Sequence, residues 1–278
     1  MWEANPSRKP VIIVDTRPKL NANANKLKGK GFENMQGYLN GILVFHGIEN
    51  IHAMRESLAS LVEVVQGSES MQVCTCTLTA AGVSGLLPEP PSTLGAALER
   101  FRSSARSLTE PAACFLQSYM SQLVDSKWLA HIRAVMDTTV QIVKYVLAGH
   151  SVLIHCSDGW DRTAQTCSLA GFMLEPYYRT IRGFIVLVEK EWLGFGHKMS
   201  DRNQFVSGKS GEVSPIFLQF LEATWQISQQ YPRAFEFNEL FLISMYDCLV
   251  SSQFGTYLCN SEKERREAKL SERTQSVS

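Results

Sequence analysis

The sequence lacks the features that mark several large classes of protein. No apolar run approaches the roughly 18 residues that a membrane-spanning helix needs. The 27 basic and 27 acidic residues balance, so binding to nucleic acid or to an anionic membrane would have to be local. The seven cysteines are odd in number and form no regular framework, which argues against a secreted disulfide scaffold. With no signal-peptide pattern at the start, these absences favour a soluble intracellular enzyme or adaptor.

The apolar residues, by contrast, are arranged for a substantial core. Hydrophobic residues make up 45% of the 278, which suits one large domain or two small ones. Short β-branched or apolar runs predict buried strands at 11–14, 42–45 and 151–154. Helical spacing or stop signals predict further helices, at 49–65, 126–148, 163–174, 180–193, from Pro215 onward, and 238–252. The fold class is therefore α/β, with a central sheet flanked by helices and a helical C-terminal half.

Three segments do not fit this pattern. Residues 17–31 carry Lys and Arg but no acid, and we expect a basic loop. Residues 67–111 are rich in Ser, Thr, Gly and Pro, and we expect a disordered insertion. It contains Cys74 and Cys76, which have no Cys or His partner at ligand spacing, so no metal site is expected there. Residues 261–278 are charged and are expected to form a fraying tail.

One segment carries chemistry. His155–Thr163 reads His-Cys-Ser-Asp-Gly-Trp-Asp-Arg-Thr, follows an apolar strand and opens a helix, so its backbone N–H groups point inward as an anion cradle. Cys156 stands at the entrance, where the helix terminus and a guanidinium favour the nucleophilic thiolate. Arg162 can close back over the loop and bind two phosphoryl oxygens, and Gly159 permits a positive φ. Thr163 can donate a hydrogen bond to the sulfur. The pattern implies attack by sulfur, a thiophosphoryl intermediate and hydrolysis.

Spacing alone is weak evidence for this chemistry. Cys259 and Arg265 have the same separation, but they follow no apolar strand and enclose acidic residues, so that match is due to chance. Within the loop, one acid must protonate the leaving oxygen. We favour Asp161 for this role and expect Asp158 to bond loop N–H groups, although the reverse assignment stays open.

The nine residues HCSDGWDRT resemble the catalytic signature of the myotubularin-related phosphatases. Further resemblance lies in VDTRPKLNANANK (14–26), GKGFEN (29–34), GIENIH (47–52), YYRTIRGF (177–184) and EKEWLGFGHK (189–198). The resemblance implies a cysteine-phosphatase-like fold. It also implies removal of the 3-phosphate from phosphatidylinositol 3-phosphate and phosphatidylinositol 3,5-bisphosphate through a cysteinyl-phosphate intermediate, without a metal or other cofactor.

The resemblance further implies which residues form the site. The catalytic set would be Cys156, Asp161 and Arg162. Two basic positions, Lys198 and Arg202, suit the additional phosphates of an inositol ring, because each phosphate needs its own counter-charge. The whole implied substrate-binding set is Asn25, Asn50, Ile51, Ser157, Asp158, Gly159, Trp160, Asp161, Arg162, Lys198 and Arg202.

The family pattern also sets expectations for context. Residues 1–260 would be part of a phosphatase domain that begins before Met1, downstream of a lipid-binding PH-GRAM domain and upstream of a coiled coil. The implied partners are a phosphoinositide headgroup at a membrane surface and a homo- or hetero-dimer with family members, with no nucleic acid. The implied location is cytoplasmic, peripheral on endosomal membranes.

Two alternatives to the lipid phosphatase stay open. A truncated, inactive member could act as an adaptor of active phosphatases, but the retention of Cys156 and Arg162 favours an enzyme. A protein-tyrosine phosphatase would carry its general acid on a separate loop, typically Trp-Pro-Asp, and this tripeptide is absent from the sequence.

Overall fold

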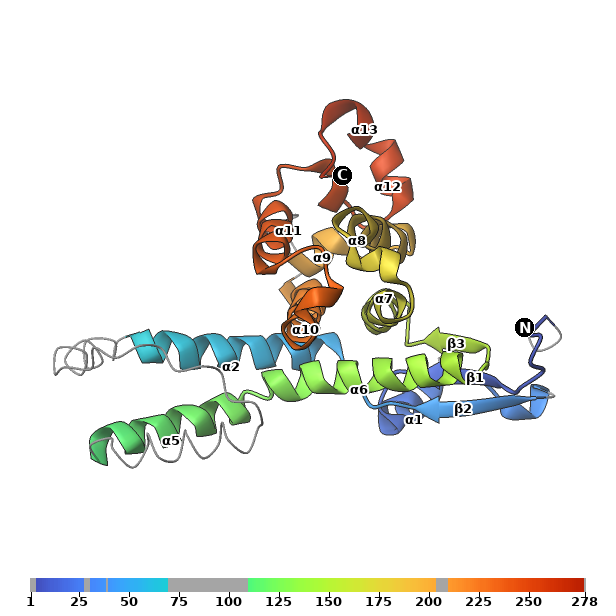
Figure 1. The fold of residues 1–278 in the computed structure, drawn as a ribbon, viewed down its shortest axis with the longest axis horizontal. Coiled ribbons are helices and arrows are strands. Elements are labelled where there is room, and N and C mark those ends of the chain that lie inside the picture. The colour runs from blue at the N-terminus through green and yellow to red at the C-terminus, as the bar shows by residue number, and fades with distance from the viewer. Residues whose placement is uncertain (1–3, 28–30, 39, 70–109, 204–209, 278) are drawn as a thin grey trace. The chain divides into compact units, whose positions relative to one another are not determined.

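The computed structural model of the chain describes residues 4–27, 31–38, 40–69, 110–203 and 210–277 (Figure 1). Backbone contacts divide the chain into two units. The first unit comprises Met1–Arg55 and Leu129–Ser278, and the second comprises Glu56–Trp128. The first unit contains the strands and the candidate site.

Among the described residues, three parallel strands form one sheet in the order β2-β1-β3. They are β1 (Val11–Asp15), β2 (Gly41–Phe45) and β3 (Val152–His155), so all three predicted strands are confirmed. The register pairs Asp15 with both Phe45 and His155. Because the strands are parallel, their carboxyl ends meet at one edge of the sheet, where open α/β folds place ligands. Cys156 follows β3 at this edge.

The predicted helices are also present, with boundaries shifted by a few residues. They are α2 (Ile51–Glu69), α6 (Trp128–Leu147), α7 (Arg162–Leu174), α8 (Ile181–Val188), α10 (Ile216–Gln230) and α11 (Glu239–Ser251). The predicted helix over 180–193 changes type at its end, since α8 continues as the π-helix η3 (Glu189–Gly194). The remaining elements are α5 (Glu110–Asp125), α9 (Met199–Asn203), η1 (Met35–Gly37), η2 (Pro176–Arg179), η4 (Ser210–Glu212), η5 (Pro232–Ala234) and η6 (Gly255–Tyr257), with three more helices described below.

The basic loop expected at 17–31 is wrong, because most of it is the helix α1 (Lys19–Leu27). Pro18 precedes the first turn, and its carbonyl accepts a hydrogen bond of 3.0 Å from the N–H of Ala22. Ala22 is fully buried. The prediction gave weight to charge and missed the alternating Asn and Ala residues, of which Ala is the strongest helix former.

The charged tail also folds, contrary to expectation, as α12 (Glu262–Glu267) and α13 (Leu270–Arg273). The hydroxyl of Ser261 accepts from the N–H of Glu264, and a carboxylate oxygen of Glu264 accepts from the N–H of Asn260. The two bonds resemble a capping box, except that Glu264 bonds the residue before the N-cap Ser261, and they stabilise the helix start. The N–H of Gly255 then bonds the carbonyl of Gln275. The domain boundary at residue 260 stays a prediction.

The expected insertion at 67–111 falls largely on residues 70–109, which lie outside the described residues together with Cys74 and Cys76. Its first residues end α2 and its last begin α5.

One face of the sheet is covered by α6 and α7 (Figure 1). Ile12 and Val14 of β1 cluster with Ile142 of α6 and Ala170 of α7, and all four are buried. Partly buried hydrophobic residues surround this cluster, namely Val44, Val143, Tyr145, Val152 and Ile154. The packing fixes α7, and therefore the loop that precedes it, against the sheet.

A second core is aromatic and lies in the helical half. Trp192 of η3 is fully buried, and its ring centroid lies 4.9 Å from that of Phe217 and 5.1 Å from that of Phe220. Phe184 of α8 stacks on Phe220 at 5.6 Å. None of the described helices is long and apolar enough to span a membrane.

Replacing Ile142 with Ala should lower the free energy of unfolding by about 2–4 kcal/mol, because it opens a cavity between α6 and the sheet. Val146 lies on the same helix but is 39% exposed, so Val146→Ala should change stability by less than about 1 kcal/mol. Denaturant unfolding of both variants measures the difference. Equal losses would contradict the assignment of this core.

Candidate active site

The loop between β3 and α7 wraps around the sulfur of Cys156. Gly159 has φ +84°, as the sequence predicts, and its N–H lies 3.2 Å from Cys156 Sγ. The Cys156 residue is 7% exposed. The predicted hydrogen bond from Thr163 to the sulfur is not made, since Thr163 Oγ1 is buried without a hydrogen-bond partner among the described residues. The loop therefore directs at least one backbone donor to the sulfur.

Arg162 is the first residue of α7 and turns back over the loop. Its Nη2 donates to the hydroxyl of Ser157 at 3.2 Å, and its Nη1 donates to the carbonyl of Ile48 at 3.2 Å. The N–H of Ile48 in turn bonds the carbonyl of Thr16 after β1. The guanidinium is thereby positioned by the sheet edge, and its contact with phosphate stays a prediction.

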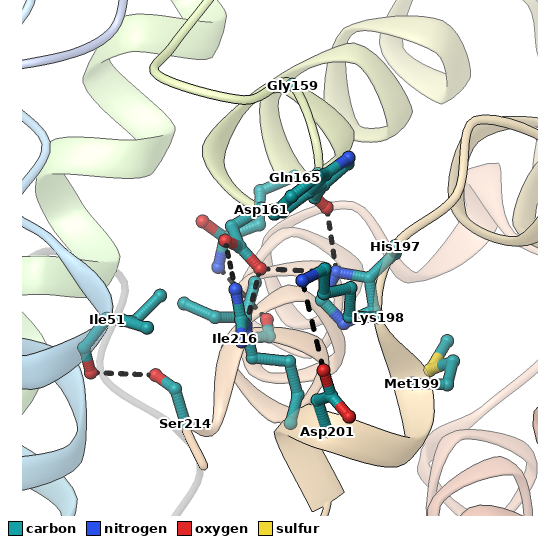
Figure 2. A network of polar contacts seen from close by, with 12 residues as sticks. Ile51, Gly159, Asp161, Gln165, His197, Lys198, Met199, Asp201, Ser214 and Ile216 are labelled. Atoms are coloured by element: carbon teal, nitrogen blue, oxygen red, sulfur yellow. Dashed lines mark hydrogen bonds and ion pairs between the residues drawn. The ribbon is translucent and has the colours of Figure 1, made fainter. Parts of the chain in front are cut away.

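Asp161 is anchored by the helical half of the protein (Figure 2). Arg202 of α9 binds both carboxylate oxygens, with Nε–Oδ1 at 2.9 Å and Nη2–Oδ2 at 3.0 Å. Nδ1 of His197 lies 3.4 Å from Oδ1. Burial alone would raise the pKa of Asp161, but the hydrogen bonds from His197 and Arg202 outweigh it and hold the pKa far below its ordinary value. Asp161 is therefore an ionised carboxylate in this structure.

The side chain of His197 also binds the backbone of the loop. Its Nδ1 lies 2.7 Å from the carbonyl oxygen of Trp160, so this nitrogen carries the proton and donates (Figure 2). The imidazole packs edge-on against buried Trp192, with ring centroids 4.7 Å apart. The positive φ of Gly196, +80°, turns the chain between η3 and His197. The aromatic core thus fixes the loop through one histidine.

The two predicted headgroup cations differ in accessibility. Lys198 Nζ lies 4.1 Å from the centroid of the Trp160 ring and 3.9 Å from a carboxylate oxygen of Asp201, and its side chain is 28% exposed. The Arg202 side chain is 3% exposed, and besides Asp161 it binds the carbonyl and a carboxylate oxygen of Glu212. Lys198 can reach a ligand, whereas Arg202 is occupied by the protein itself.

The remaining predicted contacts come from the sheet edge. The side-chain oxygen of Asn50 caps α2 by accepting from the N–H groups of His52 and Ala53, at 3.0 and 3.1 Å. The carbonyl of Ile51 accepts from the hydroxyl of Ser214 (Figure 2). Asn25 lies in α1, and its side chain is outside the description. Asp158 is exposed on the loop.

Sequence reasoning assigned no role to a buried ion pair beneath the loop. Arg17 binds both carboxylate oxygens of Asp15, with Nε–Oδ1 at 2.9 Å and Nη2–Oδ2 at 2.6 Å, and both side chains are at most 2% exposed. The hydrogen bond to Asp15 raises the pKa of Arg17, and the nearby Cys156 contributes in the same direction. The available signal was two opposite charges at the end of a buried strand.

Two other residues that join elements around the loop were also missed. The amide of Gln165 in α7 donates to the carbonyl of Ile216 and to the side chain of Gln219, which ties α7 to α10. Glu212 binds Arg202 from a segment where the sequence gave no motif.

A cysteine in a strand–loop–helix cradle, with an arginine six residues later turned over the loop, is the arrangement typical of cysteine-dependent phosphatases. Residues 2–266 match the family described as the myotubularin-like phosphatase domain, and the chain belongs to this family. The resemblance seen in the sequence is thereby confirmed.

Curated relatives carry the names of lipid phosphatases. The chain is 45% identical over 276 residues to phosphatidylinositol-3-phosphate phosphatase MTMR7 of Homo sapiens, covering 99% of this chain and 35% of the relative. It is 43% identical to phosphatidylinositol-3,5-bisphosphate 3-phosphatase MTMR6 of Mus musculus, covering 99% of this chain and 38% of the relative. The chain therefore spans little more than a third of the length of these relatives.

Asp161→Asn should lower the free energy of unfolding by about 3 kcal/mol at pH 7, because the buried Arg202 guanidinium loses the carboxylate that binds it through two hydrogen bonds and keeps only the half-exposed Glu212 as a charged partner. The folded-state pKa of Asp161 is depressed, so its stabilisation is fully present above the unfolded pKa of about 3.9 and is lost as the pH falls through the folded value. Urea unfolding from pH 7 downward should show a difference in the free energy of unfolding between wild type and variant. This difference should be constant to about pH 5 and should become smaller below about pH 4. Equal free energies of unfolding for wild type and variant at pH 7 would contradict the pairing of Asp161 with Arg202.

Proposed function

We propose that this chain is a phosphoinositide 3-phosphatase that acts on phosphatidylinositol 3-phosphate and phosphatidylinositol 3,5-bisphosphate. The observation that carries the proposal is the geometry at Cys156, where a loop N–H points at the sulfur and Arg162 lies back over the same loop. The names of the relatives support a phosphoinositide substrate. The two features together favour phosphate-ester chemistry on a lipid headgroup.

The proposed reaction has two steps. The thiolate of Cys156 attacks phosphorus, an S–P bond forms, and the P–O bond to the inositol ring breaks as the ring oxygen receives a proton. Water then attacks the cysteinyl phosphate, the S–P bond breaks, and inorganic phosphate leaves with the thiolate restored. Loop N–H groups and Arg162 would hold the three phosphoryl oxygens throughout, since preorganised donors act where charge develops.

The proposed proton donor is Asp161, and its contacts set a condition on that role. A carboxylate can donate only after it has taken up a proton, and the ion pair with Arg202 and the hydrogen bond with His197 oppose this. The proposal therefore requires the contacts of Asp161 to loosen when substrate is bound. Exposed Asp158 is the alternative donor within the loop.

The lipid substrate would confine the reaction to a membrane surface. We place the protein in the cytoplasm, peripheral on endosomal membranes, and in a homo- or hetero-dimer with family members, following the family resemblance.

An adaptor role is the second candidate function, and its distinguishing observation would be partner binding without phosphate release. A tyrosine phosphatase is less favoured because Lys198, partly exposed beside Trp160, provides a cation suited to a further headgroup phosphate.

Cys156→Ser should abolish phosphate release from both lipids while headgroup binding is retained, because the serine hydroxyl is a poor nucleophile and the cradle and Arg162 remain. Phosphate release from lipid vesicles measures the effect. Cys167 on α7 is a matched control, since burial raises the pKa of this thiol to about 12 and keeps it protonated. Cys167→Ser should therefore retain turnover, and undiminished turnover in Cys156→Ser would overturn the nucleophile.

Asp161→Asn should slow hydrolysis of the lipid by about 10²-fold or more, the usual size of a general-acid effect. An aryl phosphate has a leaving group that needs no proton, so its hydrolysis should be much less affected. Rates on both substrates are compared for Asp161→Asn and Asp158→Asn, using protein shown to be folded. Equal losses on both substrates in Asp161→Asn would mean that Asp161 only shapes the loop, and a selective loss in Asp158→Asn would move the role there.

A further inference from the structure

Arg202 is shared between two carboxylates that come from different parts of the chain. Asp161 belongs to the catalytic loop, and Glu212 belongs to η4, just before the segment that leads into α10. The Arg202–Glu212 contact is double, because Nη1 binds the backbone carbonyl at 3.0 Å and a carboxylate oxygen at 2.9 Å. Glu212 thus holds Arg202 by both its backbone and its side chain.

These contacts use most of the hydrogen-bonding capacity of Arg202. A guanidinium has five N–H groups. The contacts of Nε and Nη2 with Asp161 use two, and the two contacts of Nη1 with Glu212 use two more. One N–H of Nη2 is left. Arg202 cannot bind a phosphate with two parallel hydrogen bonds in this arrangement, although it contacts the loop directly through Asp161.

The local charge also opposes an anion at this place. Asp161, Arg202 and Glu212 together carry one net negative charge, and Lys198 on the same side of the loop lies near the carboxylate of Asp201. A ring held by one phosphate in the cradle would bring any second phosphate on this side against Lys198 and Arg202. The Glu212 side chain is 41% exposed, so it can move away without unpacking the core.

We propose that Glu212 is a specificity-determining residue that competes with the 5-phosphate of the headgroup for Arg202. This inference rests on the proposed function, since it concerns the choice between the two proposed headgroups. Glu212 favours the headgroup that lacks a 5-phosphate. A headgroup with a 5-phosphate must displace the Glu212 carboxylate to gain the guanidinium.

The experiment measures headgroup binding separately from turnover. In the Cys156→Ser chain, which cannot hydrolyse the ligand, calorimetry gives the affinities for inositol 1,3-bisphosphate and inositol 1,3,5-trisphosphate. Glu212→Gln removes the charge but keeps the size of the side chain and the backbone contact to Arg202. We expect it to raise the affinity for the trisphosphate by about fivefold or more and to leave that for the bisphosphate within about twofold.

A matched control is Glu262→Gln, which neutralises a carboxylate paired with Arg266 Nε at 3.0 Å on α12, outside this network. It should leave both affinities unchanged. In an Arg202→Gln background, confirmed as folded by circular dichroism, Glu212→Gln should lose its effect, because the competition acts through Arg202.

Equal changes in affinity for the two headgroups, or no change for either, would overturn the inference and leave Glu212 with a purely structural role. A Glu212→Gln effect that persists without Arg202 would also overturn it, as would the absence of binding by either headgroup. If the wild-type chain releases no phosphate from either lipid but the affinity ratio still shifts in Glu212→Gln, the proposed function fails and the role of Glu212 stands.

Discussion

The ion pair between Asp161 and Arg202 joins the loop between β3 and α7 to the helical half of the protein. Both groups are largely removed from water, which is unfavourable for each charge alone. Two parallel hydrogen bonds, together with the contact to His197, compensate for that loss. His197 is in turn held against Trp192 in the aromatic core. The orientation of the loop therefore depends on packing at a considerable distance along the chain.

The loop is fixed from the opposite side by the sheet edge. The carbonyl of His155 accepts from both the N–H and the hydroxyl of Thr16, and the segment after β2 receives Arg162 through the carbonyl of Ile48. The buried Asp15–Arg17 pair lies at the same edge. A loop restrained on both sides has its donors in place before a phosphate arrives, which is what electrostatic stabilisation of a transition state requires.

The sequence predicted most of the elements that follow from local pattern and missed the side-chain contacts that depend on distant partners. β1 is a continuous β-branched run, α10 carries helical spacing, and Gly159 follows from a turn that needs a positive φ. α1 was missed because its charges resembled a loop, and the tail was missed because its charge was given more weight than the Ser261–Glu264 pair that caps α12. Arg202 was expected to face a phosphate. Its position between Asp161 and Glu212 could not be predicted, since Glu212 is ten residues away in a segment without a motif.

The central claim is that Cys156 forms a covalent bond to the phosphoryl group of a phosphoinositide. The most direct test is rapid acid quenching of the wild-type chain during turnover of phosphatidylinositol 3-phosphate, followed by mass spectrometry of the peptide that contains Cys156. The account predicts a phosphoryl group on the Cys156 sulfur during turnover and its absence in Cys156→Ser. Turnover with the phosphoryl group on another residue, or undiminished turnover in Cys156→Ser, would contradict it.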